Sequence, residues 1–159
     1  MTHVLLPDIL DILRTAQDMT VATVRPDGAP QATTVSYASD GLTIFLGCGE
    51  GSQKARNLAK DPRVSLTVNL PYRDWSQIRG LSVFGRARRV TEGAPLARAA
   101  TAFLAKFPEV AQYITGQGEV AMFEITPELI SVLDYSKGFG HHDLVRVTDV
   151  SGALEAVPA

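Results

Sequence analysis

The chain has a single cysteine among its 159 residues, Cys48, so no disulfide can form within it. This favours a reducing, cytoplasmic environment. Long apolar runs are missing too, and the first residues show neither a basic leader nor a cleavage pattern, so we expect no membrane span and no signal peptide. With 15 Lys and Arg against 17 Asp and Glu, the net charge is −2, and nothing favours nucleic acid as a partner.

Residues that bind metals or catalyse hydrolysis are also scarce. Of three histidines, His141 and His142 are adjacent, so along a strand they would point to opposite faces and could not easily hold one metal ion. We therefore predict no metal site. No Ser-His-Asp or paired-carboxylate pattern stands out, so no side chain is assigned as a catalytic acid or base.

The composition, 45% hydrophobic and 20% charged, is typical of one soluble domain spanning residues 1–159. Runs of β-branched and apolar residues, separated by turn residues, predict a mainly antiparallel β protein. The expected strands are 20–25, 32–37, 42–46, 64–68, 81–90, 120–125 and 130–133, and the expected helices are 7–17, 52–60 and 94–107. Polar loops are expected at 70–78 and 135–143. Six or so antiparallel strands with a helix inserted mid-sheet favour a small closed barrel.

The most informative segment is residues 51–64, which read Gly-Ser-Gln-Lys-Ala-Arg-Asn-Leu-Ala-Lys-Asp-Pro-Arg-Val. Unpaired N–H groups and the helix dipole favour an anion at a helix start. Ser52 adds a hydroxyl at the cap position, and Lys54 and Arg56 add cations. The segment therefore predicts a phosphate site.

The glycines before this helix fit neither common nucleotide-binding motif. A Walker loop needs lysine directly after its last glycine, but Ser52 and Gln53 separate Gly51 from Lys54. A dinucleotide fingerprint needs a third glycine where Ser52 stands. Both readings are excluded.

Five segments match one family in order and spacing, from about Leu5 to Ile125. They are Thr20-Val-Ala-Thr-Val, the turn Pro26-Asp27-Gly28, Ser52-Gln-Lys-Ala-Arg-Asn-Leu, Asp61-Pro-Arg-Val-Ser-Leu and Val83-Phe-Gly-Arg-Ala. Together they resemble the pyridoxamine 5′-phosphate oxidase-like, flavin mononucleotide (FMN)-binding split-barrel family.

The resemblance implies a mainly β (α+β) fold, a six-stranded antiparallel split β-barrel of Greek-key type with peripheral helices. It also implies a homodimer with two FMN molecules in clefts between the subunits. The positions implied to bind the cofactor are Thr33, Thr34, Val35, Ser36, Gly47, Cys48, Ser52, Gln53, Lys54 and Arg79. Those implied on the substrate side are Trp75, His141 and His142.

Three positions depart from the oxidase itself. Thr33 stands where the oxidase has an arginine that grips the phosphate, Gly80 where it has a glutamine at the flavin ring, and Leu133 where it has a tryptophan. The residues that hold pyridoxal phosphate have no clear counterpart, although His141 and His142 lie in the right stretch. Pyridoxamine phosphate is therefore not the expected substrate.

These patterns predict an FMN-dependent oxidoreductase acting on an unidentified small molecule, in which the ring carries the electrons and the protein supplies position and electrostatics. One alternative on the same fold is a deazaflavin-dependent reductase, whose phosphate and carboxylate tail could use Lys54 and Arg56. Another is a non-enzymatic flavin or haem-binding protein, with His141 or His142 on the iron. A barrel that has lost its cofactor is the third.

Overall fold

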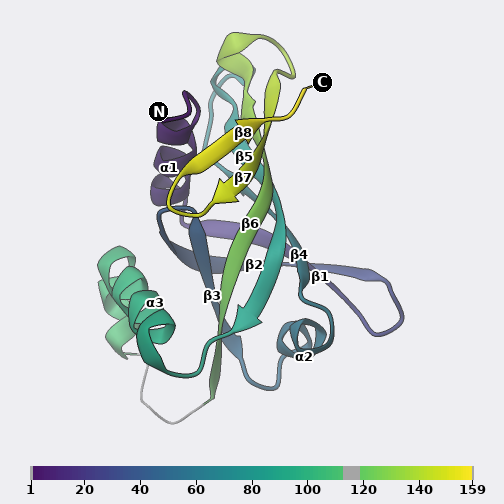
Figure 1. Ribbon diagram of the computed structural model, residues 1–159, viewed down its shortest axis with the longest axis vertical. Helices are drawn as coiled ribbons and strands as arrows, with labels where there is room; N and C mark the ends of the chain where they lie inside the picture. Colours follow the sequence, from purple (N-terminus) through teal and green to yellow (C-terminus); the bar gives the residue numbers. More distant parts are fainter. Residues whose placement is uncertain (1, 113–118, 159) are drawn as a thin grey trace.

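The structure, a computed structural model, describes residues 2–112 and 119–158 (Figure 1). Its strands are β1 (Asp18–Val24), β2 (Pro30–Asp40), β3 (Thr43–Gly49), β4 (Arg63–Asn69), β5 (Arg79–Arg89), β6 (Val120–Asp134), β7 (His142–Asp149) and β8 (Ala153–Ala156). Its α-helices are α1 (Leu6–Thr15), α2 (Gln53–Lys60) and α3 (Gly93–Lys106), with short 3-10 turns at η1 (Trp75–Gln77), η2 (Pro108–Gln112) and η3 (Tyr135–Lys137).

Six antiparallel strands close into a barrel. The strand order is β3-β2-β1-β4-β5-β6, and β3 pairs again with β6, which closes the circle. β6 belongs to the barrel along its first half, where Ile125 faces Ile44 of β3. Its second half pairs with β7 instead, and β8 extends the sheet outward. The predicted six-stranded barrel is therefore confirmed, with two further strands appended.

The core fills the barrel because side chains alternate along each strand. In β4, Val64, Leu66 and Val68 are buried while the residues between them are exposed. α1 packs its buried face, including Ile9 and Ile12, against the same core. Burying such a side chain contributes roughly 1.5–3 kcal/mol. α3 packs separately on the outside of β2 and β3, where Phe103 meets Phe45.

The prediction was wrong about the last third of the chain. Residues 120–125 and 130–133, expected as two strands, are parts of one 15-residue strand, β6. The strand continues past Pro127 because the register shifts between Phe84 and Gly85, so that Gly85 faces the proline. A Cβ at Gly85 would lie 2.4 Å from the Thr126 carbonyl oxygen, so glycine is required at this close approach.

Two strands were missed by sequence reasoning. β7 begins at His142, inside the segment expected to be a polar loop, and β8 follows it as a hairpin. β5 likewise begins at Arg79, two residues earlier than expected. In the described part of the chain, no helix is long and apolar enough to cross a membrane.

Candidate functional site

The barrel is split between β2 and β3. The two strands pair from Asp40 and Thr43 as far as Tyr37 and Leu46. Beyond that point β2 pairs with β1 on its other side, while the end of β3 pairs with β6. The first half of β2 and the end of β3 therefore separate, and α2 begins directly after β3 (Figure 1).

The start of α2 has the geometry of an anion site. Ser52 is the N-cap, with extended backbone, and its Oγ accepts a hydrogen bond of 3.2 Å from the Ala55 N–H. The Arg56 N–H is bonded to the Ser52 carbonyl. Within residues 2–112 and 119–158, the N–H groups of Gln53 and Lys54 have no acceptor. The predicted helix is confirmed, and two free donors point out of its positive end.

The cations near this helix start are not equivalent. The Arg56 guanidinium donates to the Gly51 carbonyl and, over 2.8 Å, to Gln53 Oε1. Glu50, just before the helix, is paired with Arg89. Lys54 is partly buried and makes neither a hydrogen bond nor an ion pair with the described residues. Lys54 is thus the cation left available to an incoming anion.

The four predicted residues of β2 divide between the two faces of the strand. Thr34 and Ser36 are exposed on the outer face, where the Thr34 hydroxyl lies 3.5 Å from that of Thr20 and the Ser36 hydroxyl donates to Asp18. Thr33 and Val35 lie on the other, partly buried face. The strand therefore cannot present all four side chains to one ligand.

Thr33 carries the clearest sign of a missing partner. Its hydroxyl oxygen is buried and has no hydrogen-bond partner in the part of the chain that the structure describes. A buried unsatisfied polar atom costs about 1–3 kcal/mol, which is unusual unless a ligand completes it. A flavin carries hydrogen-bond donors and acceptors that could pair with the Thr33 hydroxyl, so the residues present fit a flavin cofactor.

Gly47 and Cys48, at the end of β3, line the split through their backbone. They pair with Met122 and Ala121 of β6 and are partly buried. The Cys48 side chain packs against the barrel core, as a small apolar residue does.

The remaining predicted residues lie at the other end of the barrel. Arg63 of β4, three residues after α2, faces Arg86 of β5, whereas Asn69 at the far end of β4 faces Gly80. Arg79 therefore lies seven residues along β5 from the α2 end, and its guanidinium is within 3.5 Å of Asp8 and Asp11 of α1. Figure 1 shows α1 and α2 at opposite ends of the barrel.

Aromatic and histidine side chains gather near Arg79. Trp75 is 64% exposed, and its ring centroid is 5.9 Å from that of Phe139, which is 81% exposed. His141 Nε2 lies 3.0 Å from Asp143 Oδ2, and His142 Nδ1 lies 3.2 Å from the Gly140 carbonyl oxygen. One chain therefore does not bring these three predicted substrate-side residues to its own α2.

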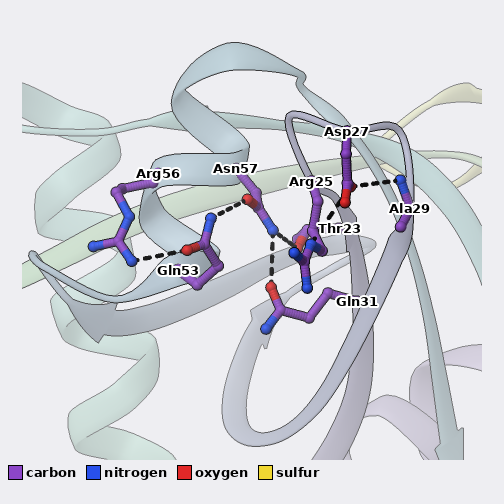
Figure 2. A network of polar contacts seen from close by, with 8 residues as sticks. All are labelled: Thr23, Arg25, Asp27, Ala29, Gln31, Gln53, Arg56 and Asn57. Atoms are coloured by element: carbon purple, nitrogen blue, oxygen red, sulfur yellow. Dashed lines mark hydrogen bonds and ion pairs between the residues drawn. The ribbon is translucent and has the colours of Figure 1, made fainter.

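Sequence reasoning missed a buried polar network beneath α2. Asn57 is fully buried and bonds to Thr23 of β1 and Gln31 of β2 (Figure 2). A weak signal was present: Asn57 follows Gln53 by four residues, so both lie on one helix face. Phe139 was not named individually, although it lies in the loop 135–143 that the sequence predicted. Among the described residues, no group of three or more His, Cys, Asp or Glu could hold a metal ion.

Comparison with known proteins identifies relatives. A haem-binding protein of Mycobacterium smegmatis is 26% identical with a TM-score of 0.74, over 85% of this chain and 55% of that one, so the chain spans about half its length. A conserved hypothetical protein of Mycobacterium tuberculosis is also 26% identical, with a TM-score of 0.74, over 86% of this chain and 88% of that one. HutZ, the haem storage protein of Vibrio cholerae, is 20% identical with a TM-score of 0.67, over 78% of this chain and 90% of that one.

No curated protein matches the chain in sequence. The model of the pyridoxamine 5′-phosphate oxidase family, in contrast, matches residues 5–134, which include the whole barrel, the split and α2. With the six-stranded split barrel and the capped helix start, this match shows that the chain belongs to the pyridoxamine 5′-phosphate oxidase-like family.

Proposed function

We propose that this protein is an FMN-binding oxidoreductase that acts on a small molecule other than pyridoxamine phosphate. The observation that carries the proposal is the combination, at one split, of a buried unpartnered Thr33 hydroxyl, two free N–H groups at the start of α2, and an uncommitted Lys54. Lys54 and the two N–H groups can bind a phosphate, and the Thr33 hydroxyl can pair with an oxygen of the ribityl chain or the ring.

Each residue has a specific role in this proposal. The Lys54 ammonium and the N–H groups of Gln53 and Lys54 hold the phosphate, and the Ser52 hydroxyl can donate to it while accepting from Ala55. Thr33 supplies one hydroxyl in place of a cation, so Lys54 provides most of the positive charge. When bound, the flavin supplies the redox chemistry, and the protein residues bind and orient it.

A homodimer completes the site. Thr34 and Ser36 lie on a sheet face of mostly small uncharged side chains that also carries Phe84 opposite Ser65, with Asp18, Arg63 and Arg86 at its rim. The residues of this Ser/Thr face are Thr20, Ala32, Thr34, Ser36, Ser65, Thr67 and Ser82. An uncharged centre with a charged rim is typical of protein interfaces. The proposed second copy would dock on this face.

A haem-binding protein is the second candidate. One relative at 26% identity is described as haem-binding, and His141 and His142 come soon after Phe139 in the chain, whose exposed ring contacts that of Trp75. An imidazole can bind haem iron, and apolar rings can pack against a porphyrin face. The deazaflavin alternative has less support, because Arg56 is committed to Gly51 and Gln53.

One titration series distinguishes these functions. The purified protein is mixed in turn with FMN, riboflavin, a deazaflavin and haemin, and absorption and flavin fluorescence are recorded. We expect FMN to bind more tightly than riboflavin, because the phosphate contacts Lys54 and α2. A protein that takes up haemin with a sharp Soret band but no flavin would support the second candidate and overturn the first.

A further inference from the structure

A chain of side-chain amides joins α2 to the first half of β2. Asn57 Nδ2 donates to Gln31 Oε1 over 3.1 Å and to Thr23 Oγ1 over 3.0 Å. Asn57 Oδ1 accepts from Gln53 Nε2 over 2.8 Å, and Gln53 Oε1 accepts from Arg56 (Figure 2). We call Gln31, Gln53, Arg56 and Asn57 the amide network.

Arg56 fixes the direction of every hydrogen bond in the network. A guanidinium can only donate, so Gln53 must turn its oxygen toward Arg56 and its nitrogen toward Asn57. Asn57 must then accept at Oδ1, which leaves its two N–H groups for Gln31 and Thr23. Reversing the Asn57 amide would set nitrogen against the Gln53 nitrogen and oxygen against the Gln31 oxygen. The network therefore has one arrangement.

The network spans the part of the barrel where strand pairing is missing. β2 and β3 stop pairing at Tyr37, and Gln31 and Thr33 lie on the stretch of β2 that pairs with β1 but not with β3. Gln31 is two residues from Thr33 and shares its face, while Gln53 and Arg56 belong to the turn of α2 that carries Lys54. The amide network connects these two sides of the split.

We propose that Asn57 is a positioning residue: through the amide network it fixes the start of α2 relative to β2, and so sets how the site receives the phosphate of a mononucleotide. This inference rests on the proposed function. Asn57 itself is fully buried and does not touch the ligand. The Gln53 side chain is part of the network, so Gln53 contributes its backbone N–H to the site.

The first test compares FMN with riboflavin, which differs only in lacking the phosphate. We expect Asn57→Leu to lower the ratio of the riboflavin to the FMN dissociation constant by at least ~10-fold, since a charged hydrogen bond that loses its alignment costs about that much. Val83→Ala, at a buried position in β5, is the control for general destabilisation. If Val83→Ala lowers the ratio as far as Asn57→Leu does, the positioning role of Asn57 is overturned.

Variants of Arg56 test whether this residue acts by fixing the direction of the hydrogen bonds in the amide network or by its charge. Arg56→Gln removes the charge but keeps an N–H donor for Gln53, whereas Arg56→Leu removes both. We expect Arg56→Gln to keep the ratio within ~3-fold of the parent protein and Arg56→Leu to lower it several-fold. Equal losses in the two variants would show that Arg56 acts by its charge, and would overturn its role in the network.

A second measurement needs no ligand. Amide hydrogen exchange in Asn57→Leu is expected to accelerate at residues 31–36 and 55–57 together, while residues 37–40, which pair with β3, keep their protection. Wild-type exchange in both segments would overturn the connection across the split. If the parent protein binds no flavin, the proposed function fails, and this measurement alone decides whether the network joins α2 to β2.

Discussion

Replacing Lys54 by alanine tests the phosphate site most directly. Lys54 follows the N-cap Ser52 by two residues and has no hydrogen-bond or ion-pair partner among the described residues, so its removal breaks no polar contact that the structure contains. The free N–H groups of the α2 start remain. We therefore expect Lys54→Ala to keep the fold and the melting temperature and to change only the binding of anions.

The size of the effect follows from the contact that is lost. A hydrogen bond to a charged group contributes roughly 1.5–3 kcal/mol, which corresponds to about 10–150-fold in a dissociation constant. A point-charge calculation at ~4 Å with an effective dielectric constant of about 20 gives ~4 kcal/mol as an upper limit. The expected loss of FMN affinity is therefore about 10–150-fold, and it should shrink at high salt.

Fluorescence titration of FMN and of riboflavin measures this loss. Lys60→Ala is the matched control, because it removes the same charge from the exposed last turn of the same helix. Riboflavin affinity should be unchanged in both variants. The reasoning is refuted if Lys54→Ala weakens FMN binding by less than ~3-fold, if it weakens riboflavin binding equally, or if Lys60→Ala weakens FMN binding as much.

Three further outcomes are expected. Thr33→Val should raise the unfolding free energy of the ligand-free protein by about 1 kcal/mol in denaturant titrations, because it removes a buried unpartnered hydroxyl, and should weaken FMN; lower stability would contradict this. Thr67→Glu, on the Ser/Thr face, should sediment as a monomer, whereas Thr101→Glu on exposed α3 should remain a dimer; a dimeric Thr67→Glu would argue against this interface. Burial lowers the pKa of Lys106 from 10.5 to about 8, so between these pH values only the unfolded chain holds the proton. The unfolding free energy should therefore rise by about 1 kcal/mol from pH 8 to pH 10. This is less than the full ~1.36 kcal/mol per pH unit, because the Lys106 side chain is partly exposed. Lys106→Met should flatten this slope, and a fall instead would show that the Leu13 carbonyl and the Tyr37 ring hold the proton.

Local patterns were sufficient for most of the barrel. Alternation along β4, the turn at Pro26-Asp27-Gly28 and the capped start of α2 depend on neighbouring residues, and the structure confirms them. The single long β6 could not be predicted in the same way. Pro127 normally interrupts a strand, and only the facing Gly85, far away in sequence, lets the pairing continue.

In the candidate site, too, features that depend on neighbouring residues could be predicted from the sequence, and features that depend on distant residues could not. Ser52 and Lys54 could be placed from a short motif, because their geometry follows from a helix start. The free hydroxyl of Thr33 depends on where β2 and β3 separate, which no local pattern records. Asn57 looks like an ordinary polar helix residue, and its burial appears only when the β1–β2 hairpin is folded against α2.

The distance between the two groups of predicted residues is itself an argument for the dimer. Arg79 and Arg86 are seven residues apart on β5, or about 23 Å at ~3.3 Å per residue, and α2 lies at the Arg86 end. One chain therefore cannot bring Arg79, predicted to bind the cofactor, and Trp75, predicted on the substrate side, close to its own Lys54. A two-fold axis can, because an isologous interface that places one copy's Arg79 end against the other's α2 start also forms the reverse contact. Such a dimer has two equivalent sites, and each is built from both chains.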